Sequence, residues 1–140
     1  MHPSNSALAH YRQVRSAEAE AGADPHRAIQ LLLAGVIERL RHASACIERG
    51  DVAGKAQAIS RSLDIVQGLR LALDHDAGGS IAAGLESLYV YAETELVRAN
   101  ASNDAASLRD IAGLFDEIHT AWQAIPSQLA AARQQQAVPA

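Results

Sequence analysis

Residues 78–104 read GGSIAAGLESLYVYAETELVRANASND. The stretch is typical of a loop, one complete amphipathic helix with two tyrosines, and a second loop. Apolar side chains recur at helical spacing on one face, which consists of Ile81, Leu85, Leu88, Ala92 and Ala99. Tyr89, Leu96 and Asn100 lie one position round the helix, and Tyr91 stands further off. The stretch therefore predicts a bundle helix with one surface for a core and a second surface beside it.

Three further helices are predicted on either side of this one. Asp24 before Pro25 is a strong helix start, because the carboxylate can accept backbone N–H groups and proline is tolerated in the first turn. Gly50 supplies the stop, and Asp51 and Asp104 can cap the next and the last helix. The three inner faces are Ile29, Leu33, Val36, Leu40, Ala43 and Ile47; Val52, Ala56, Ile59, Leu63, Val66 and Leu73; and Leu108, Ile111, Phe115, Ile118, Trp122 and Ile125.

The fold class follows from these segments. The third helix is expected to end near Asp74 and the last at Pro126. Four helices of about 20 to 25 residues with short connections predict an all-α, antiparallel up-and-down four-helix bundle. Residues 1–126 are expected to form this single domain, with a short accessory N-terminal helix within residues 1–20. Residues 127–140 have little to bury, so a flexible tail is expected there.

Composition excludes several classes of protein. The chain of 140 residues has a net charge of −4, and its basic residues are scattered, so no nucleic-acid-binding footprint is visible. No segment has the length and apolarity of a membrane span, so no stable membrane insertion is expected and a cytoplasmic location is the default. Cys46 is the only cysteine, which rules out an intramolecular disulfide.

A search for chemistry yields two weak candidates. A di-metal carboxylate bundle needs two Glu-x-x-His motifs, and the nearest match is Asp116 with His119, so no metal or cofactor is expected. His42 raises the alternative of a histidine phosphotransfer bundle, but no lysine or glycine follows it at the supporting positions. His10 and His26 lie near helix ends and are expected to be solvated. No nucleophile elbow or phosphate-binding loop occurs, so the chain is not predicted to be an enzyme.

The third and fourth helices carry more apolar surface than a bundle helix usually buries. A core-facing helix devotes about three positions in seven to the interior. The third and fourth helices have apolar residues beyond that number. These could line a groove for an amphipathic segment of a partner, and they are Ile65, Leu69, Tyr89 and Leu96. The alternative is a wider core with the N-terminal helix packed over them, and the periodicity leaves both interpretations open.

The chain resembles the flagellar secretion chaperone family, FliS, from about Tyr11 to Trp122. The resemblance rests on the order and spacing of several short pieces. They are Tyr11, Leu31 to Ile37, Ile59-x-Arg61-Ser62-x-x-Ile65-Val66, Leu69, Leu73, Asp74, Gly78-Gly79-x-Ile81-Ala82, Leu88-Tyr89-x-Tyr91, Leu96, Ala99-Asn100, Asn103-Asp104 and Trp122.

This resemblance implies a cytoplasmic export chaperone without a cofactor. Such a protein binds the disordered C-terminal region of flagellin, prevents premature polymerisation and delivers it to the type III export apparatus, where an export gate protein is a second partner. Whether the free protein is a monomer or a homodimer stays open.

The resemblance also implies a set of partner-binding residues. It adds Leu8 and Tyr11 on the N-terminal helix, which cover a client groove or dock at the export gate, and Asn100, whose amide would bond the client backbone. The full set is Leu8, Tyr11, Ile65, Leu69, Tyr89, Tyr91, Leu96 and Asn100. The alternative for the two tyrosines is a core or boundary ring, and for Asn100 a helix C-cap.

Overall fold

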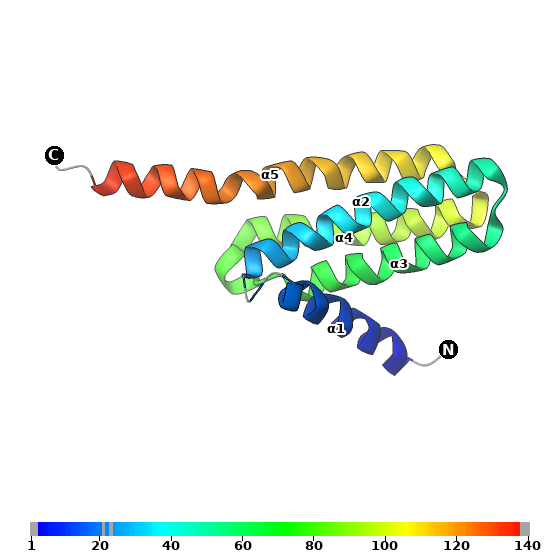
Figure 1. The fold of residues 1–140 in the computed structure, drawn as a ribbon, viewed down its shortest axis with the longest axis horizontal. Coiled ribbons are helices and arrows are strands. Elements are labelled where there is room, and N and C mark those ends of the chain that lie inside the picture. Colours follow the sequence, from blue (N-terminus) through cyan, green and yellow to red (C-terminus); the bar gives the residue numbers. More distant parts are fainter. Residues whose placement is uncertain (1–2, 21, 23, 138–140) are drawn as a thin grey trace.

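Five helices make up the described part of the chain, in which no strand occurs. The computed structural model describes the backbone of residues 3–20, 22 and 24–137, and the side chains of residues 8–17, 19, 22 and 24–125. The helices are α1 (Pro3–Glu20), α2 (Pro25–Arg49), α3 (Val52–Leu71), α4 (His75–Ser102) and α5 (Ala105–Ala137). Helices α2 to α5 run alternately up and down beside one another, and α1 leaves the bundle at an angle (Figure 1). The predicted four-helix bundle with an accessory N-terminal helix is confirmed.

The predicted capping residues define the ends of α2 and the start of α3. The Asp24 carboxylate accepts hydrogen bonds from the backbone N–H groups of His26 and Arg27. Gly50 ends α2 with φ of 74°, a conformation that glycine adopts without a steric penalty. Asp51 then accepts the backbone N–H of Gly54 at 2.9 Å and starts α3. Local chemistry therefore sets the tight α2–α3 turn.

The connection between α3 and α4 differs from the prediction. α3 ends at Leu71, and Asp74 caps the start of α4 by accepting the backbone N–H of Ala77 at 3.0 Å. The segment expected to be a loop therefore begins as a helical turn. The break falls within α4 at Gly79, where φ of 50° and ψ of −125° interrupt the helix. Glycine tolerates this conformation, so the glycine pair kinks the helix instead of ending it.

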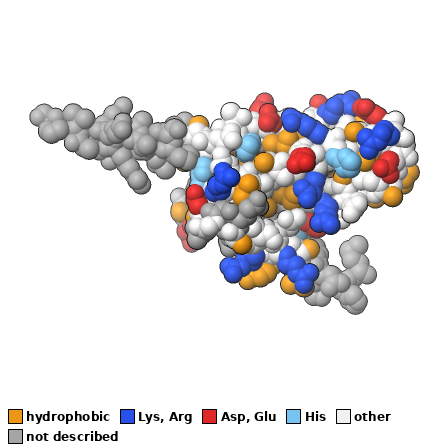
Figure 2. All heavy atoms as spheres, viewed as in Figure 1, with side chains coloured by type: hydrophobic (Ala, Val, Ile, Leu, Met, Phe, Trp, Pro, Cys, Tyr) orange, Lys and Arg blue, Asp and Glu red, His pale blue; other side chains and the backbone are white. Residues whose placement is uncertain are grey.

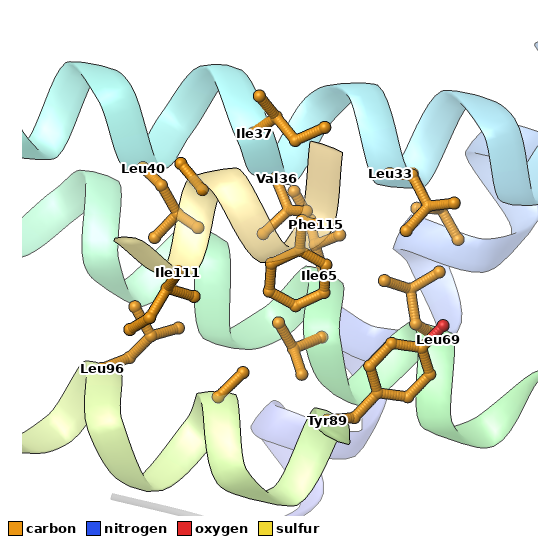
Figure 3. Packing of buried hydrophobic residues seen from close by; sticks show 14 of the residues in the cluster. Leu33, Val36, Ile37, Leu40, Ile65, Leu69, Tyr89, Leu96, Ile111 and Phe115 are labelled. Atoms are coloured by element: carbon orange, nitrogen blue, oxygen red, sulfur yellow. The ribbon is translucent and has the colours of Figure 1, made fainter. Parts of the chain in front are cut away.

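α2 is the central helix of the molecule. It packs against α1, α3 and α5, whereas α4 packs against α3 and only sparsely against α5. Leu33, Val36 and Leu40 of α2 have no exposed surface, and Figure 3 shows them meeting side chains from the other bundle helices. The Tyr89 and Phe115 rings stack with their centroids 6.1 Å apart. The core is thus densest around α2 and thinnest between α4 and α5.

α5 continues to Ala137, so the prediction that it ends at Pro126 is wrong. A proline inside a helix leaves the carbonyl four residues earlier without its N–H donor. That carbonyl belongs to Trp122, and the His26 ring occupies the vacant position with Nε2 2.7 Å from the Trp122 oxygen. A ring nitrogen that meets a carbonyl oxygen must carry the proton, so His26 Nε2 is the donor. A side chain from α2 therefore compensates for the proline in α5.

The same two residues make further contacts. Trp122 Nε1 donates to the backbone oxygen of His26 at 2.8 Å, and the two rings stack with centroids 5.0 Å apart. His26 is half-buried here, so the prediction that it is solvated is wrong. The flexibility of residues 127–140 stays a prediction, and residues 138–140 lie outside the described residues.

We expect His26→Phe to lower the free energy of unfolding by about 1 kcal/mol, because the ring can still stack but the Trp122 carbonyl loses its donor. Pro126→Ala restores a backbone N–H at that position, so the His26→Phe penalty should shrink in the Pro126→Ala background. Urea denaturation of the wild type, the two single variants and the double variant measures the His26→Phe penalty in both backgrounds. An equal penalty in both backgrounds would show that the histidine does not serve this carbonyl.

Candidate functional site

A pocket opens at the end of the bundle where α3 passes into α4. Its volume is about 300 Å³, and its walls come from α2, α3, α4 and α5 and from the α3–α4 turn. The lining is almost entirely apolar: Ile29, Leu69, Ala72, Leu73, Asp74, Ala77, Gly78, Ile81, Ala82, Leu85, Tyr89 and Trp122. We refer to it as the end pocket. The preponderance of aliphatic and aromatic walls suits apolar side chains rather than a charged ligand.

Exposed apolar residues lie on the helices that form the end pocket. Ile81 is 74% exposed and lines it, and Leu71 at the end of α3 is 68% exposed. Ile81 was expected on the core face of its helix. That expectation is wrong, because Ala82 and not Ile81 is the buried residue in the first turns of α4. Large apolar side chains left in water beside an apolar pocket are typical of a binding surface.

Tyr89 lines the end pocket from α4. Its side chain is buried, and burial raises the pKa of the Tyr89 hydroxyl to about 12. The phenol therefore stays neutral at physiological pH and cannot contribute a negative charge to the pocket. The stacked Phe115 ring holds the Tyr89 ring in place.

A second hollow lies between α4 and α5, where these helices pack sparsely. Its volume is about 270 Å³, and its lining is Tyr91, Glu95, Ser107, Asp110, Ile111 and Leu114. Tyr91 is 55% exposed and presents its ring to this hollow, which we call the α4–α5 groove. The groove combines apolar side chains with two carboxylates.

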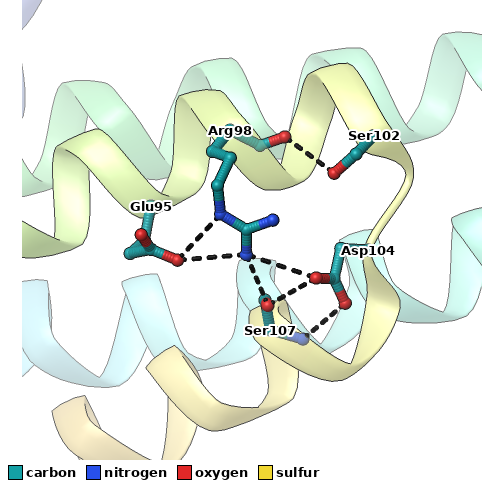
Figure 4. Close-up of polar contacts among 5 residues, drawn as sticks. All are labelled: Glu95, Arg98, Ser102, Asp104 and Ser107. Atoms are coloured by element: carbon teal, nitrogen blue, oxygen red, sulfur yellow. Dashed lines mark hydrogen bonds and ion pairs between the residues drawn. The ribbon is translucent and has the colours of Figure 1, made fainter.

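A polar network ties α4 to α5 near this groove (Figure 4). Arg98 donates to Glu95, to Asp104 and to the Ser107 hydroxyl. The Ser107 hydroxyl and backbone N–H both donate to the Asp104 carboxylate, at 2.7 and 3.0 Å. These bonds from Ser107, together with Arg98, hold the pKa of Asp104 below its usual value. The connection after α4 is therefore secured by polar contacts where apolar packing is thin.

The structure separates the predicted partner-binding residues into three groups. Leu8, Tyr11 and Tyr91 are exposed, at 45%, 60% and 55%. Leu69 and Tyr89 are buried but line the end pocket. Ile65 and Leu96 are core residues, 2% and 0% exposed, so they do not line an open groove in this structure.

Asn100, the last of the set, is half-buried. Its backbone oxygen accepts a hydrogen bond from Lys55 Nζ at 3.1 Å. The helix C-cap suggested for it belongs to Asn103, which has φ of 54°. The contact of these eight residues with a partner stays a prediction.

The N-terminal helix packs on the bundle through one of its faces. Leu8 and Tyr11 lie on another face and point outward. His10 and Ala17, each 6% exposed, face the bundle instead. His10 is therefore not solvated as predicted, because Asp64 of α3 lies 3.5 Å from its Nε2. A buried histidine paired with a carboxylate cannot be recognised from apolar spacing.

The structure does not bring the candidate metal-ligating and phosphoacceptor residues together into a site. Among the described residues, no group of three or more His, Cys, Asp or Glu could hold a metal ion. His42 Nε2 lies 3.5 Å from the buried Cys46 Sγ and the His42 side chain is exposed. In the described part of the chain, no helix is long and apolar enough to cross a membrane. The end pocket and the exposed apolar residues beside it are suited to binding rather than to catalysis.

Sequence reasoning missed several residues of these surfaces. Leu73, Leu85 and Trp122 were assigned to the core, yet all three line the end pocket. Their helical periodicity is the same for a core position and for a pocket wall. The only available signal was the glycine pair, which marks where α4 bends away from the bundle.

Comparison with known proteins identifies related chains. The sequence pattern of the family described as Flagellar protein FliS matches residues 7–129. Flagellar secretion chaperone FliSB of Pseudomonas aeruginosa is 40% identical over 119 residues, which are 85% of this chain and 94% of that protein. Flagellar secretion chaperone FliS of Salmonella typhimurium is 37% identical, over 86% of this chain and 90% of the relative. Flagellar secretion chaperone FliS of Vibrio cholerae is 35% identical, over 84% of this chain and 87% of the relative. These relatives are named as chaperones and not as enzymes.

We expect Asp104→Asn to destabilise the protein most at neutral pH. A carboxyl whose pKa is lowered by folding contributes stability above its unfolded pKa, about 4, and that contribution is lost as the pH falls through the folded value. The difference in free energy of unfolding between wild type and variant should therefore narrow below about pH 4. Urea denaturation across this range measures it, with Asp110→Asn, an exposed residue of α5, as the control. A difference that is constant with pH would contradict the role of the ionised carboxylate.

Proposed function

Because the chain belongs to the flagellar protein FliS family, we propose that it is a cytoplasmic export chaperone for flagellin. It binds the disordered C-terminal segment of flagellin, prevents premature polymerisation and delivers the client to the type III export apparatus. The family is one of chaperones and not of enzymes, which agrees with the prediction that the chain is not an enzyme.

The observation that carries this proposal is the end pocket with Ile81 exposed on its lining. A disordered segment that folds as an amphipathic helix needs a preformed apolar recess for its largest side chains. The end pocket has the size for one or two such side chains, and Ile81 adds apolar surface against which the client backbone can lie. Asp74 is the single charged residue in the lining, so the end pocket has few groups that could bind a polar ligand.

The α4–α5 groove extends this surface along the same helix. Ile81 and Tyr91 are ten positions apart, which corresponds to about 15 Å along a helix. A client segment anchored in the end pocket can therefore continue along α4 and cover Tyr91. Val90 and Val97, 42% and 59% exposed, lie on the side of α4 opposite Ile81 and add further apolar surface there. The helix thus offers exposed apolar side chains on more than one of its sides, a track for an extended client that wraps round it.

The remaining predicted residues fit this proposal in different ways. Leu8 and Tyr11 are exposed on α1, where they are available to the export gate protein. Ile65 and Leu96 support the track from inside the core and would reach a client only if the helices moved apart. In the absence of client, the apolar surface around Ile81 would also allow a homodimer.

The reason for reversible binding is thermodynamic. A client that folds on binding spends part of the interaction free energy on its own ordering, on the order of 2 to 5 kcal/mol. The complex can therefore bury a large apolar area and still be released at the export machinery. Burial of that area also predicts a large negative heat-capacity change.

We expect Ile81→Asp to weaken client binding about tenfold or more, because it places a charge beside the apolar end pocket. Titration calorimetry with a peptide covering the C-terminal segment of flagellin from the same organism measures the dissociation constant and the heat-capacity change. Val52→Asp is the matched control, since Val52 is 71% exposed at the opposite end of α3 and should leave affinity unchanged.

Both variants replace exposed side chains, so their stability should match that of the wild type, which denaturation verifies. Absence of binding by the folded wild-type protein would refute the proposed function. Equal weakening by the two variants would instead refute the end pocket as the docking surface.

A further inference from the structure

A polar hollow separates α1 from α3 on the side of the molecule away from α5. Its volume is about 390 Å³, and it is lined by Ala9, Arg12, Gln13 and Ser16 of α1 and by Arg61 and Asp64 of α3. Five of these six residues are polar, in contrast to the end pocket. This hollow takes no part in the client surface proposed above.

Two arginines from different helices line this hollow. Arg12 and Arg61 are both exposed, and neither has an ion-pair or hydrogen-bond partner among the residues whose side chains are described. Figure 2 shows basic side chains over the part of the molecule that α1 occupies. Guanidinium groups donate in a planar fork that matches the oxygens of phosphate and carboxylate groups.

The one carboxylate in the hollow is already engaged. Asp64 lies 3.5 Å from Nε2 of His10, whose side chain is buried between α1 and the bundle. The two guanidinium groups therefore outnumber the acidic group, and the hollow has a net positive charge. Gln13 and Ser16 add an amide and a hydroxyl donor on the α1 side.

The two helices that carry these arginines pack closely against each other. A β-carbon on Gly68 would lie 3.3 Å from Val14 Cγ2 and 3.8 Å from the His10 backbone oxygen, so the absence of a side chain lets α1 approach α3 closely. Ala17 is buried one turn beyond. This close approach fixes the backbone of α1 against α3, from which the Arg12 and Arg61 side chains extend.

We propose that this hollow binds a phosphate group between Arg12 and Arg61. The bound anion accepts hydrogen bonds from α1 and α3 at once, and it offsets the excess of positive charge in the hollow. Because both helices contribute ligands, the anion binds only when α1 is packed on α3, and binding therefore favours that state. Inorganic phosphate and a phosphate ester share this chemistry.

The test measures whether phosphate slows amide hydrogen exchange in α1. Inorganic phosphate is titrated at fixed ionic strength, with chloride as the balancing anion, and exchange is followed over residues 8–17 by mass spectrometry. We expect slower, saturable exchange in the wild type. Arg12→Gln and Arg61→Gln should each raise the concentration for half the effect about tenfold, because each removes one guanidinium contact.

The control and the source of the anion are tested in the same experiment. Arg41→Gln removes an exposed arginine of α2 that does not line the hollow, and it should behave as wild type. Glycerol phosphate acting at lower concentration than inorganic phosphate would identify an ester as the preferred ligand, and equal action would identify the free anion. Either result supports the site.

Two results would overturn the proposal. The first is no phosphate effect on α1 exchange in the wild type. The second is an effect that grows without saturation and equally in all four proteins, which would be a general ionic effect. Circular dichroism before titration establishes that each variant is helical, and each variant's exchange without phosphate serves as its own baseline.

Discussion

The structure depends on the burial of one side of α2. Leu33, Val36, Leu40 and Ala43 have no exposed surface, because α3 and α5 close over them from two directions and α1 covers a third. Burial of aliphatic side chains supplies most of the favourable free energy in a bundle of this size. Because α2 already packs against three helices, it has little apolar surface left for contact with α4. α4 has no contact with α2 comparable to those of α3 and α5, and it is the bundle helix that packs least extensively.

The incomplete coverage of α4 accounts for both candidate surfaces. Its buried stripe packs on α3, yet the side toward α5 stays loosely filled and Ile81 in its first turns is exposed. Gly79 contributes to this, since the kink changes the direction of the chain just before Ile81. Arg98 and Asp104 then secure the far end of the helix through polar bonds. An anchored helix with an uncovered apolar side is well suited to receive a client without rearranging the core.

α1 is attached to the bundle largely through polar contacts, whereas α2 is held by apolar burial. Its contact with α2 and α3 includes a buried histidine next to a carboxylate, a close approach at Gly68 and a polar hollow with two arginines. Polar contacts of this kind are weaker than apolar burial and respond to ions and to partners. The bundle and its accessory helix therefore differ in how their association can be changed from outside. Figure 1 shows the same division, with α1 at an angle to the four parallel and antiparallel rods.

The amino-acid sequence by itself determined the helix count, the cap at Asp24, the turn at Gly50 and the all-α bundle, because these depend on local hydrogen bonding and on apolar periodicity. Periodicity also identified Ile65 and Leu96 as apolar helix positions, but it could not tell a core position from a groove. Tertiary structure alone decided which face of α1 packs inward, that α5 continues through Pro126, and that Ile81 is exposed. The first two depend on atoms distant in sequence: the Asp64 carboxylate near His10 and the His26 ring at the Trp122 carbonyl. The exposure of Ile81 depends on how α4 packs against its neighbours.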